Sequence, residues 1–148
     1  MRNYIQSFPE HISEALNIVE SIELNFNFSL IQNIVISGQG GSSIGALIAK
    51  NILQYQINRP VFINQDYNIP EFVDQNTLFI ASSYSGQTEE TIQALKYAIK
   101  KNSQIFCLSS GGELLDIAKK NQLSYSLIPS GGVPRAMLCY SLVQLLYV

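Results

Sequence analysis

The sequence predicts an α/β fold, a three-layer sandwich with a five-stranded parallel sheet flanked by helices. Short apolar runs alternate with segments of three- and four-residue apolar spacing through most of the 148 residues, as a parallel sheet with helical crossovers requires. The short runs are apolar at consecutive positions, which is typical of strands buried on both faces. A chain of this length makes about one domain with an adequate core.

The alternation sets the order of the elements. We expect strands at residues 34–36, 61–63, 78–81, 105–108 and 125–128. Helical spacing covers residues 12–22, 44–52, 92–99 and 114–117, and a last helix is expected to start near Arg135. Ser7 and Glu10 form a capping-box pattern at the first helix, with Pro9 in its first turn. The mostly polar residues 65–76 are expected to form a long connection.

Charge and composition exclude several classes of protein. The net charge is −2 and the basic residues are scattered, so the basic patch that nucleic-acid binding requires is not expected. No apolar leader region precedes the first helix, and the longest mostly apolar stretch, residues 136–148, is shorter than the roughly 20 residues that span a bilayer. We therefore expect a cytoplasmic protein that binds neither nucleic acid nor membrane.

Residues that commonly bind metals are few. Cys107 and Cys139 lie in apolar runs without metal-ligand spacing, and both are expected to be buried free thiols. The single histidine, His11, lies in the first helix outside every motif and is expected to be a surface or packing residue. No metal site and no cofactor are therefore expected.

A glycine-rich loop with the sequence GQGGSSIG, residues 38–45, follows the first predicted strand and opens a helix. In open parallel sheets ligands lie beside such loops, where glycines admit them close to the backbone. A dinucleotide fingerprint fails because Ser43 stands in place of the third glycine, and a P-loop fails because no Gly-Lys-Ser/Thr follows. A plain tight turn is the alternative.

Three hydroxyl side chains, Ser83, Ser85 and Thr88, crowd the loop after the third predicted strand, in the sequence SYSGQTEET. Hydroxyl and backbone donors at a helix N-terminus form an anion site without any lysine, and a monoester phosphate is its natural occupant. The alternative is an N-cap at Thr88 followed by acids of the first turn. For Glu89 and Glu90 that structural role is favoured.

Two further loops combine glycine with polar residues. The segment Ser109–Gly112 is short, and both a ligand contact and a simple turn remain open. In PSGGVPRA, residues 129–136, two prolines stiffen a glycine turn and place Arg135 at a helix start. Because a cation there opposes the helix dipole, we interpret Arg135 as a group that holds developing negative charge on a substrate. An ordinary surface arginine is the alternative.

Together, SGQGGSSIG, SYSGQTEET and VPRA resemble the sugar isomerase (SIS) domain, and more specifically the N-terminal SIS domain of bifunctional phosphoglucose/phosphomannose isomerases. The resemblance covers nearly the whole chain and implies a SIS-type, flavodoxin-like fold. It implies a sugar-phosphate site formed by Gly41, Ser42, Ser83, Ser85 and Thr88. It also implies that Arg135 stabilises an enediolate, and that the proton-transferring glutamate and the ring-opening histidine come from a second SIS domain or a partner subunit.

We therefore expect residues 1–148 to be a single SIS domain, the N-terminal half of a longer two-domain chain. It would bind glucose 6-phosphate, mannose 6-phosphate or fructose 6-phosphate for aldose–ketose isomerisation, and would be inactive alone because it lacks the base. The expected partners are the sugar phosphate and a second SIS domain or an identical subunit, as in a homodimer, which would cover the apolar last helix.

Two other functions compete with this one. A stand-alone module that senses a sugar phosphate fits the missing base equally well, but such a sensor has no need of Arg135. A flavodoxin-type nucleotide-binding domain is disfavoured by the two failed fingerprints.

Overall fold

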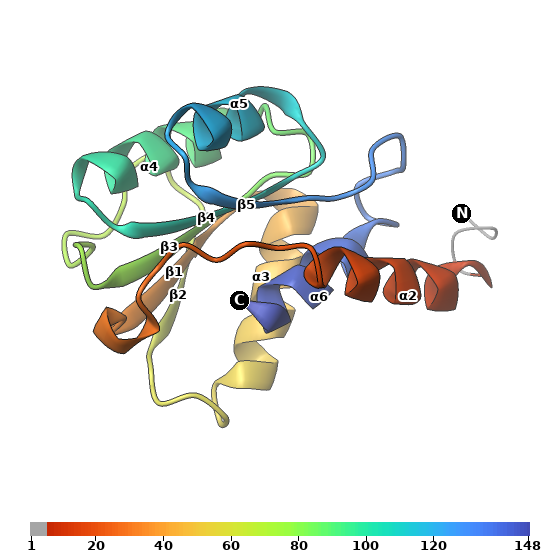
Figure 1. Ribbon diagram of the computed structural model, residues 1–148, viewed down its shortest axis with the longest axis horizontal. Helices are drawn as coiled ribbons and strands as arrows, with labels where there is room; N and C mark the ends of the chain where they lie inside the picture. The colour runs from red at the N-terminus through yellow and green to blue at the C-terminus, as the bar shows by residue number, and fades with distance from the viewer. Residues whose placement is uncertain (1–5) are drawn as a thin grey trace.

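A computed structural model describes residues 6–148, and its five strands form one parallel sheet (Figure 1). The strands are β1 (Asn33–Ser37), β2 (Val61–Asn64), β3 (Thr77–Ser82), β4 (Gln104–Ser109) and β5 (Ser124–Leu127). The helices are α2 (Phe8–Val19), α3 (Gly40–Leu53), α4 (Glu89–Lys100), α5 (Gly112–Lys120) and α6 (Leu138–Tyr147), and a short 3-10 helix, η1, spans Phe28–Leu30. The predicted α/β fold with its five strands is confirmed.

The strands lie in the order β2-β1-β3-β4-β5, and every neighbouring pair is parallel. The chain adds β2 on one side of β1 and then crosses back to place β3 on the other side. Strand order therefore reverses between β1 and β3, the point where open α/β sheets bind ligands beyond the carboxyl ends of their strands.

Helices cover both faces of the sheet. Figure 1 shows α4 and α5 on one face and α2, α3 and α6 on the other. The centre of the sheet is buried from both sides: all six residues of β3 are buried, which explains why its apolar run is continuous. On the edge strand β5 burial alternates, with Tyr125 and Leu127 turned outward.

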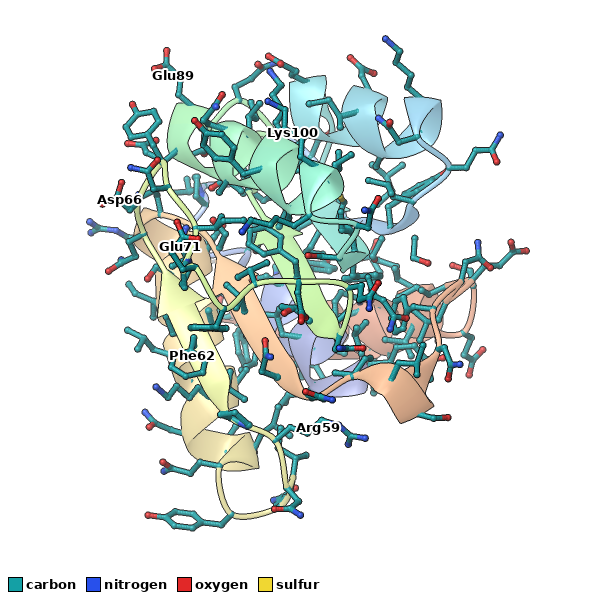
Figure 2. All side chains as sticks on the ribbon, turned by 90° about the vertical axis from the view of Figure 1, so that its left-hand side faces the viewer. Arg59, Phe62, Asp66, Glu71, Glu89 and Lys100 are labelled. Carbon is teal, nitrogen blue, oxygen red and sulfur yellow. The ribbon has the colours of Figure 1, made fainter. Side chains whose placement is uncertain are left out.

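The predicted connection, residues 65–76, runs beside the outer edge of β2. Phe62, which Figure 2 shows on this side of the molecule, packs its ring against Phe72 of the connection at a centroid distance of 4.6 Å. Arg59 Nε donates a hydrogen bond to the Ile31 carbonyl oxygen at 2.6 Å. These contacts hold the turn before β2 and the connection after it against the sheet.

The last helix differs from the prediction in two ways. It begins at Leu138 rather than near Arg135, because a turn with Ala136 and Met137 N–H groups bonded to the Val133 carbonyl comes first. It is also largely covered by this chain: α6 packs against α2 and α3. The Tyr140 hydroxyl donates to Glu14 of α2 at 2.6 Å.

Two predictions concern single side chains of the first helix. The His11 ring lies 5.4 Å from the Tyr140 ring, so its expected role as a packing residue is confirmed. The Ser7 side chain, expected to cap α2, makes no cap hydrogen bond. The capping-box prediction is wrong, although Pro9 does lie in the first turn.

One group of exposed apolar side chains lies on α3. Ile44, Leu47 and Ile52 are between 42% and 48% exposed, and Tyr55, just beyond the helix, is 89% exposed. These positions fall on one side of α3. Exposed apolar surface is therefore present on α3 as well as at the end of the last helix, where Leu146 and Tyr147 are exposed.

Both cysteines are buried free thiols, as expected. Burial raises the pKa of Cys107 to about 12, so its thiol stays protonated and unreactive at neutral pH. None of the helices in residues 6–148 is both long and apolar enough to cross a bilayer.

Candidate functional site

The first candidate loop lies where strand order reverses. Gly38 follows β1 so closely against β3 that a Cβ there would lie 2.8 Å from the Ser82 carbonyl oxygen, so the glycine is needed for the strand ends to meet. A Cβ on Gly41 would lie 3.7 Å from the Pro134 carbonyl oxygen. The first loop and the loop that carries Arg135, remote in sequence, therefore face each other.

Two adjacent serines of the first loop have different surroundings. Ser43 is buried, and its hydroxyl accepts a hydrogen bond from Gln65 Nε2 at 2.7 Å. Ser42 is half-buried and faces the cleft described below. Its hydroxyl has no hydrogen-bond partner among residues 6–148. Ser42 is therefore the serine of this pair that is free to bind a ligand.

The hydroxyl loop, residues 83–88, brings two of its three predicted hydroxyls into contact. Ser83 Oγ and Thr88 Oγ1 lie 2.8 Å apart, and the Gly86 N–H donates to Ser83 Oγ at 3.1 Å. Ser83 is buried, Thr88 is half-buried and Ser85 is exposed, with its Oγ accepting the Gln87 N–H at 3.2 Å. Ser83 thus orients Thr88, while Ser85 and Thr88 reach the surface.

No side chain at the N-cap position of α4 caps the free N–H groups of its first turn. Thr88 occupies the N-cap position, but its hydroxyl makes no cap hydrogen bond. The first-turn N–H groups, which have no partner within a helix, are therefore not capped by it. Open N–H groups beside surface hydroxyls form the anion-binding arrangement that the sequence suggests.

The two acids that begin α4 face the connection after β2. Glu89 is exposed at the start of the helix (Figure 2), and its carboxylate accepts a hydrogen bond from the Tyr67 hydroxyl at 3.4 Å. The charge of Glu90, desolvation and the charge of Glu89 together raise the pKa of Tyr67. Both carboxylates therefore act on the connection, in agreement with a structural role in the first turn.

The Ser109–Gly112 loop supports the hydroxyl loop. The Ser110 N–H and hydroxyl donate to the Tyr84 carbonyl oxygen at 3.1 Å and 2.6 Å. A Cβ at Gly86, where φ is +67°, would lie 1.8 Å from the Gly111 carbonyl oxygen. The Leu114 N–H donates to the Gly86 carbonyl at 3.0 Å. Of the two roles left open by the sequence, the structure favours the structural one.

Arg135 lies in the turn that precedes α6, three residues before the helix begins. It is exposed and makes no hydrogen bond or ion pair with residues 6–148. The predicted position at a helix N-terminus is wrong, because the turn separates Arg135 from the helix dipole. Its guanidinium is nevertheless unpaired among residues 6–148, and Arg135 follows Pro134, whose carbonyl oxygen Gly41 faces.

A narrow cleft joins three of these loops. Its walls are Gly41 and Ser42 from the first loop, Ser82 and Tyr84 around the hydroxyl loop, and Pro134 and Met137 from the arginine loop, over a floor that includes Leu108, Ile128 and Ser141. A wider hollow of about 590 Å³ lies between the segment after α2 and β5. It contains none of the predicted site residues, whereas the cleft, whose volume of about 10 Å³ admits about one water molecule, contains Gly41 and Ser42.

Two residues of the cleft do not follow from the sequence motifs. Ser82, the last residue of β3, is 1% exposed, and its hydroxyl has no hydrogen-bond partner in the described chain. Tyr84 Oη accepts the Gly132 N–H of the arginine loop at 3.0 Å. In the sequence, only their position beside the predicted hydroxyls could have pointed to them. Their hydrogen-bond partners depend on the order of the strands, which the spacing of residues along the chain does not reveal.

Comparison with known proteins finds similar sequences among named isomerases. The chain is 41% identical over 142 residues to a bifunctional phosphoglucose/phosphomannose isomerase of Caldicellulosiruptor bescii, covering 96% of this chain and 42% of that protein. It is 39% identical over 140 residues to the protein of the same name from Thermoplasma acidophilum, covering 95% and 43%. Its sequence is homologous to part of these isomerases. No protein-family model matches the chain.

The fold is shared with a putative phosphosugar isomerase from Clostridium difficile 630, at a TM-score of 0.77 and 22% identity, covering 99% of this chain and 44% of that one. The chain superposes on the C-terminal domain of glucosamine-fructose-6-phosphate aminotransferase from Francisella tularensis with a TM-score of 0.80 and 18% identity, covering 97% of this chain and 45% of that one. This likeness concerns the fold alone. The chain spans about two fifths of the length of the isomerases that it matches.

Gly86→Ala is expected to lower the free energy of unfolding by more than about 3 kcal/mol, because left-handed strain adds to the clash with Gly111. Gly131→Ala is the matched control: φ is +86° there, but nothing lies within 4 Å of a new Cβ. It should cost only about 1–2 kcal/mol. Urea denaturation measures both, and equal losses would contradict the contact between the two loops.

Ser82→Ala should leave the free energy of unfolding unchanged or raise it by up to about 1 kcal/mol, because the hydroxyl it removes has no partner. Ser109→Ala is the control, since Ser109 is equally buried at the end of β4 and donates to the Gly111 carbonyl at 2.7 Å. It should lose about 1 kcal/mol. Similar losses in both variants would show that Ser82 is already hydrogen-bonded, for example to an ordered water.

Proposed function

We propose that this chain is the sugar-phosphate-binding domain of an aldose–ketose isomerase acting on glucose 6-phosphate or mannose 6-phosphate and fructose 6-phosphate. The observation that carries the proposal is the hydroxyl loop, which presents Ser85 and Thr88 beside the uncapped start of α4. The names of the homologous isomerases support the reaction and the substrates.

In this proposal each loop takes one part of the substrate. The phosphate accepts hydrogen bonds from Ser85, Thr88 and the first N–H groups of α4, with Ser83 holding the Thr88 hydroxyl in place. The sugar extends past Gly41 and Ser42 toward the arginine loop. The proposal invokes no metal or other cofactor, because hydroxyl and N–H donors stabilise the phosphate charge by hydrogen bonding.

The chemistry is a proton transfer between C2 and C1 of the opened sugar. A carboxylate base removes the proton and returns it to the neighbouring carbon through a cis-enediolate. Arg135 stabilises the negative oxygen of that intermediate. Glu89 is directed toward Tyr67, so the base is proposed to come from a second SIS domain or a partner subunit.

The uncovered side of α3 supports such a partner. Its first exposed apolar side chain, Ile44, comes two positions after Ser42, so a body that covers α3 lies beside the sugar. The homologous isomerases are more than twice as long as their matched parts, which fits a chain continuing into a second SIS domain; an identical subunit in a homodimer is the other form. The buried free thiols suit a reducing cytoplasm.

Fructose 6-phosphate at millimolar concentration is expected to raise the melting temperature, because a ligand of the native state stabilises it. Ser85→Ala combined with Thr88→Ala should weaken that binding by at least about tenfold, since hydrogen bonds to a charged group are lost. Fructose serves as the unphosphorylated ligand. The variant Ser13→Ala with Ser21→Ala, which removes two exposed hydroxyls around α2, serves as the matched protein.

Calorimetric titration measures the affinities for fructose 6-phosphate and for fructose. No shift of the wild-type protein with fructose 6-phosphate would contradict the proposed function. If the α2 control lost as much affinity as the loop variant, the assignment of the phosphate to the hydroxyl loop would be wrong.

The chain alone is expected to show no turnover of glucose 6-phosphate to fructose 6-phosphate in a coupled assay, although it binds the product. Measurable turnover would mean that the base lies within this chain. In that case Glu89→Gln, Glu90→Gln and His11→Asn would identify it by loss of the rate.

A further inference from the structure

Tyr84 links two loops that the proposed function assigns to opposite ends of the substrate. It lies between Ser83 and Ser85 in the hydroxyl loop, and its hydroxyl oxygen accepts the N–H of Gly132 at 3.0 Å. Gly132 belongs to the loop that carries Arg135. The two bonded residues are 48 positions apart in the sequence, so this contact exists only in the folded chain.

Both ends of Tyr84 are held. Its carbonyl oxygen accepts two hydrogen bonds from Ser110, at 2.6 Å and 3.1 Å. Its ring is partly buried against the core below α6. A tyrosine fixed at the backbone and at the ring gives its hydroxyl a defined position, so the Gly132 N–H is bonded to a rigid acceptor.

The arginine loop is folded onto that contact. A Cβ at Gly132 would clash with the Met137 sulfur, so the backbone of the loop lies close against the side chain of the residue that leads into α6. Between these two points, the Met137 N–H donates to the Val133 carbonyl and closes the turn that contains Arg135. Fixing Gly132 and Met137 therefore fixes the turn from which the guanidinium extends.

We propose that Tyr84 is a positioning residue that couples occupation of the phosphate loop to the placement of Arg135. The proposal rests on the proposed function and goes beyond it by naming the link between its two halves. A sugar phosphate that reaches both loops gains from the link, whereas inorganic phosphate, which occupies only the hydroxyl loop, does not.

Tyr84→Phe tests the link because it keeps the ring and the backbone contacts to Ser110 but removes the acceptor of the Gly132 N–H. Binding of fructose 6-phosphate should weaken about three- to tenfold, the usual effect of one lost hydrogen bond. Binding of inorganic phosphate, followed by NMR titration, should change less than about twofold. In the free protein, hydrogen exchange at the Gly132 amide should become faster.

A double-mutant cycle with Arg135→Gln gives the decisive readout. If Tyr84 acts through Arg135, its substitution has little further effect on fructose 6-phosphate binding once the guanidinium is gone. Tyr125→Phe is the matched control, because its hydroxyl makes no hydrogen bond with residues 6–148 and Tyr125 does not line the cleft. It should bind both ligands as the wild-type protein does.

Three results would overturn the proposal. Equal weakening for both ligands would show that Tyr84 supports the hydroxyl loop as a whole, and additive effects with Arg135→Gln would show that the two residues act independently. An unchanged rate of hydrogen exchange at the Gly132 amide in Tyr84→Phe would show that the hydrogen bond from Gly132 to Tyr84 does not form. Failure of the proposed function gives a different result: the wild-type protein then binds no fructose 6-phosphate, and the proposal falls with it.

Discussion

The close contact between the loops after β3 and β4 is the constraint on which the rest of the site depends. Gly86 and Gly112 both have left-handed φ values and approach so closely that neither tolerates a Cβ without a clash. The contact determines which first-turn N–H groups of α4 and α5 are already hydrogen-bonded within the chain. The Leu114 N–H of α5 is bonded to the Gly86 carbonyl, whereas the first turn of α4 is left uncapped by Thr88. Of these two helices, α4 therefore keeps more of its first-turn N–H groups available to an anion.

The sequence was sufficient for the fold because its strongest signals are local. Consecutive apolar residues in 78–81 predict a strand buried on both faces, and β3 is buried at all six positions. Glycine-rich segments after three strands correctly located loops at the carboxyl edge of the sheet. Helix ends follow less directly from the pattern: the residues before Leu138 form a turn in which the Ala136 and Met137 N–H groups bond to the Val133 carbonyl, and the helix begins only after it.

Only part of the candidate site could be predicted from the sequence. The exposed hydroxyl of Ser85 and the free guanidinium of Arg135 belong to motifs that could be seen directly, although their proposed roles stay predictions. Ser110 and Tyr84 have roles that arise from partners 26 and 48 residues away. Those contacts require the strand order β3-β4-β5 and the turn before α6, which no short spacing encodes.

At the edge of the site, both the apolar surface of α3 and the proposed catalytic machinery are incomplete. The α3 helix begins with cleft residues and continues with a row of apolar side chains that residues 6–148 leave exposed, and large exposed apolar patches mark interaction sites. In the proposed isomerase the missing base must approach the sugar from outside the hydroxyl and arginine loops. A partner body packed on α3 satisfies both requirements at once, because it buries Ile44 and Leu47 while bringing its own side chains next to Ser42. In this proposal, docking of the partner covers the apolar side of α3 and completes the catalytic site in one step. The link through Tyr84 already holds Arg135 in position on the substrate when the partner docks.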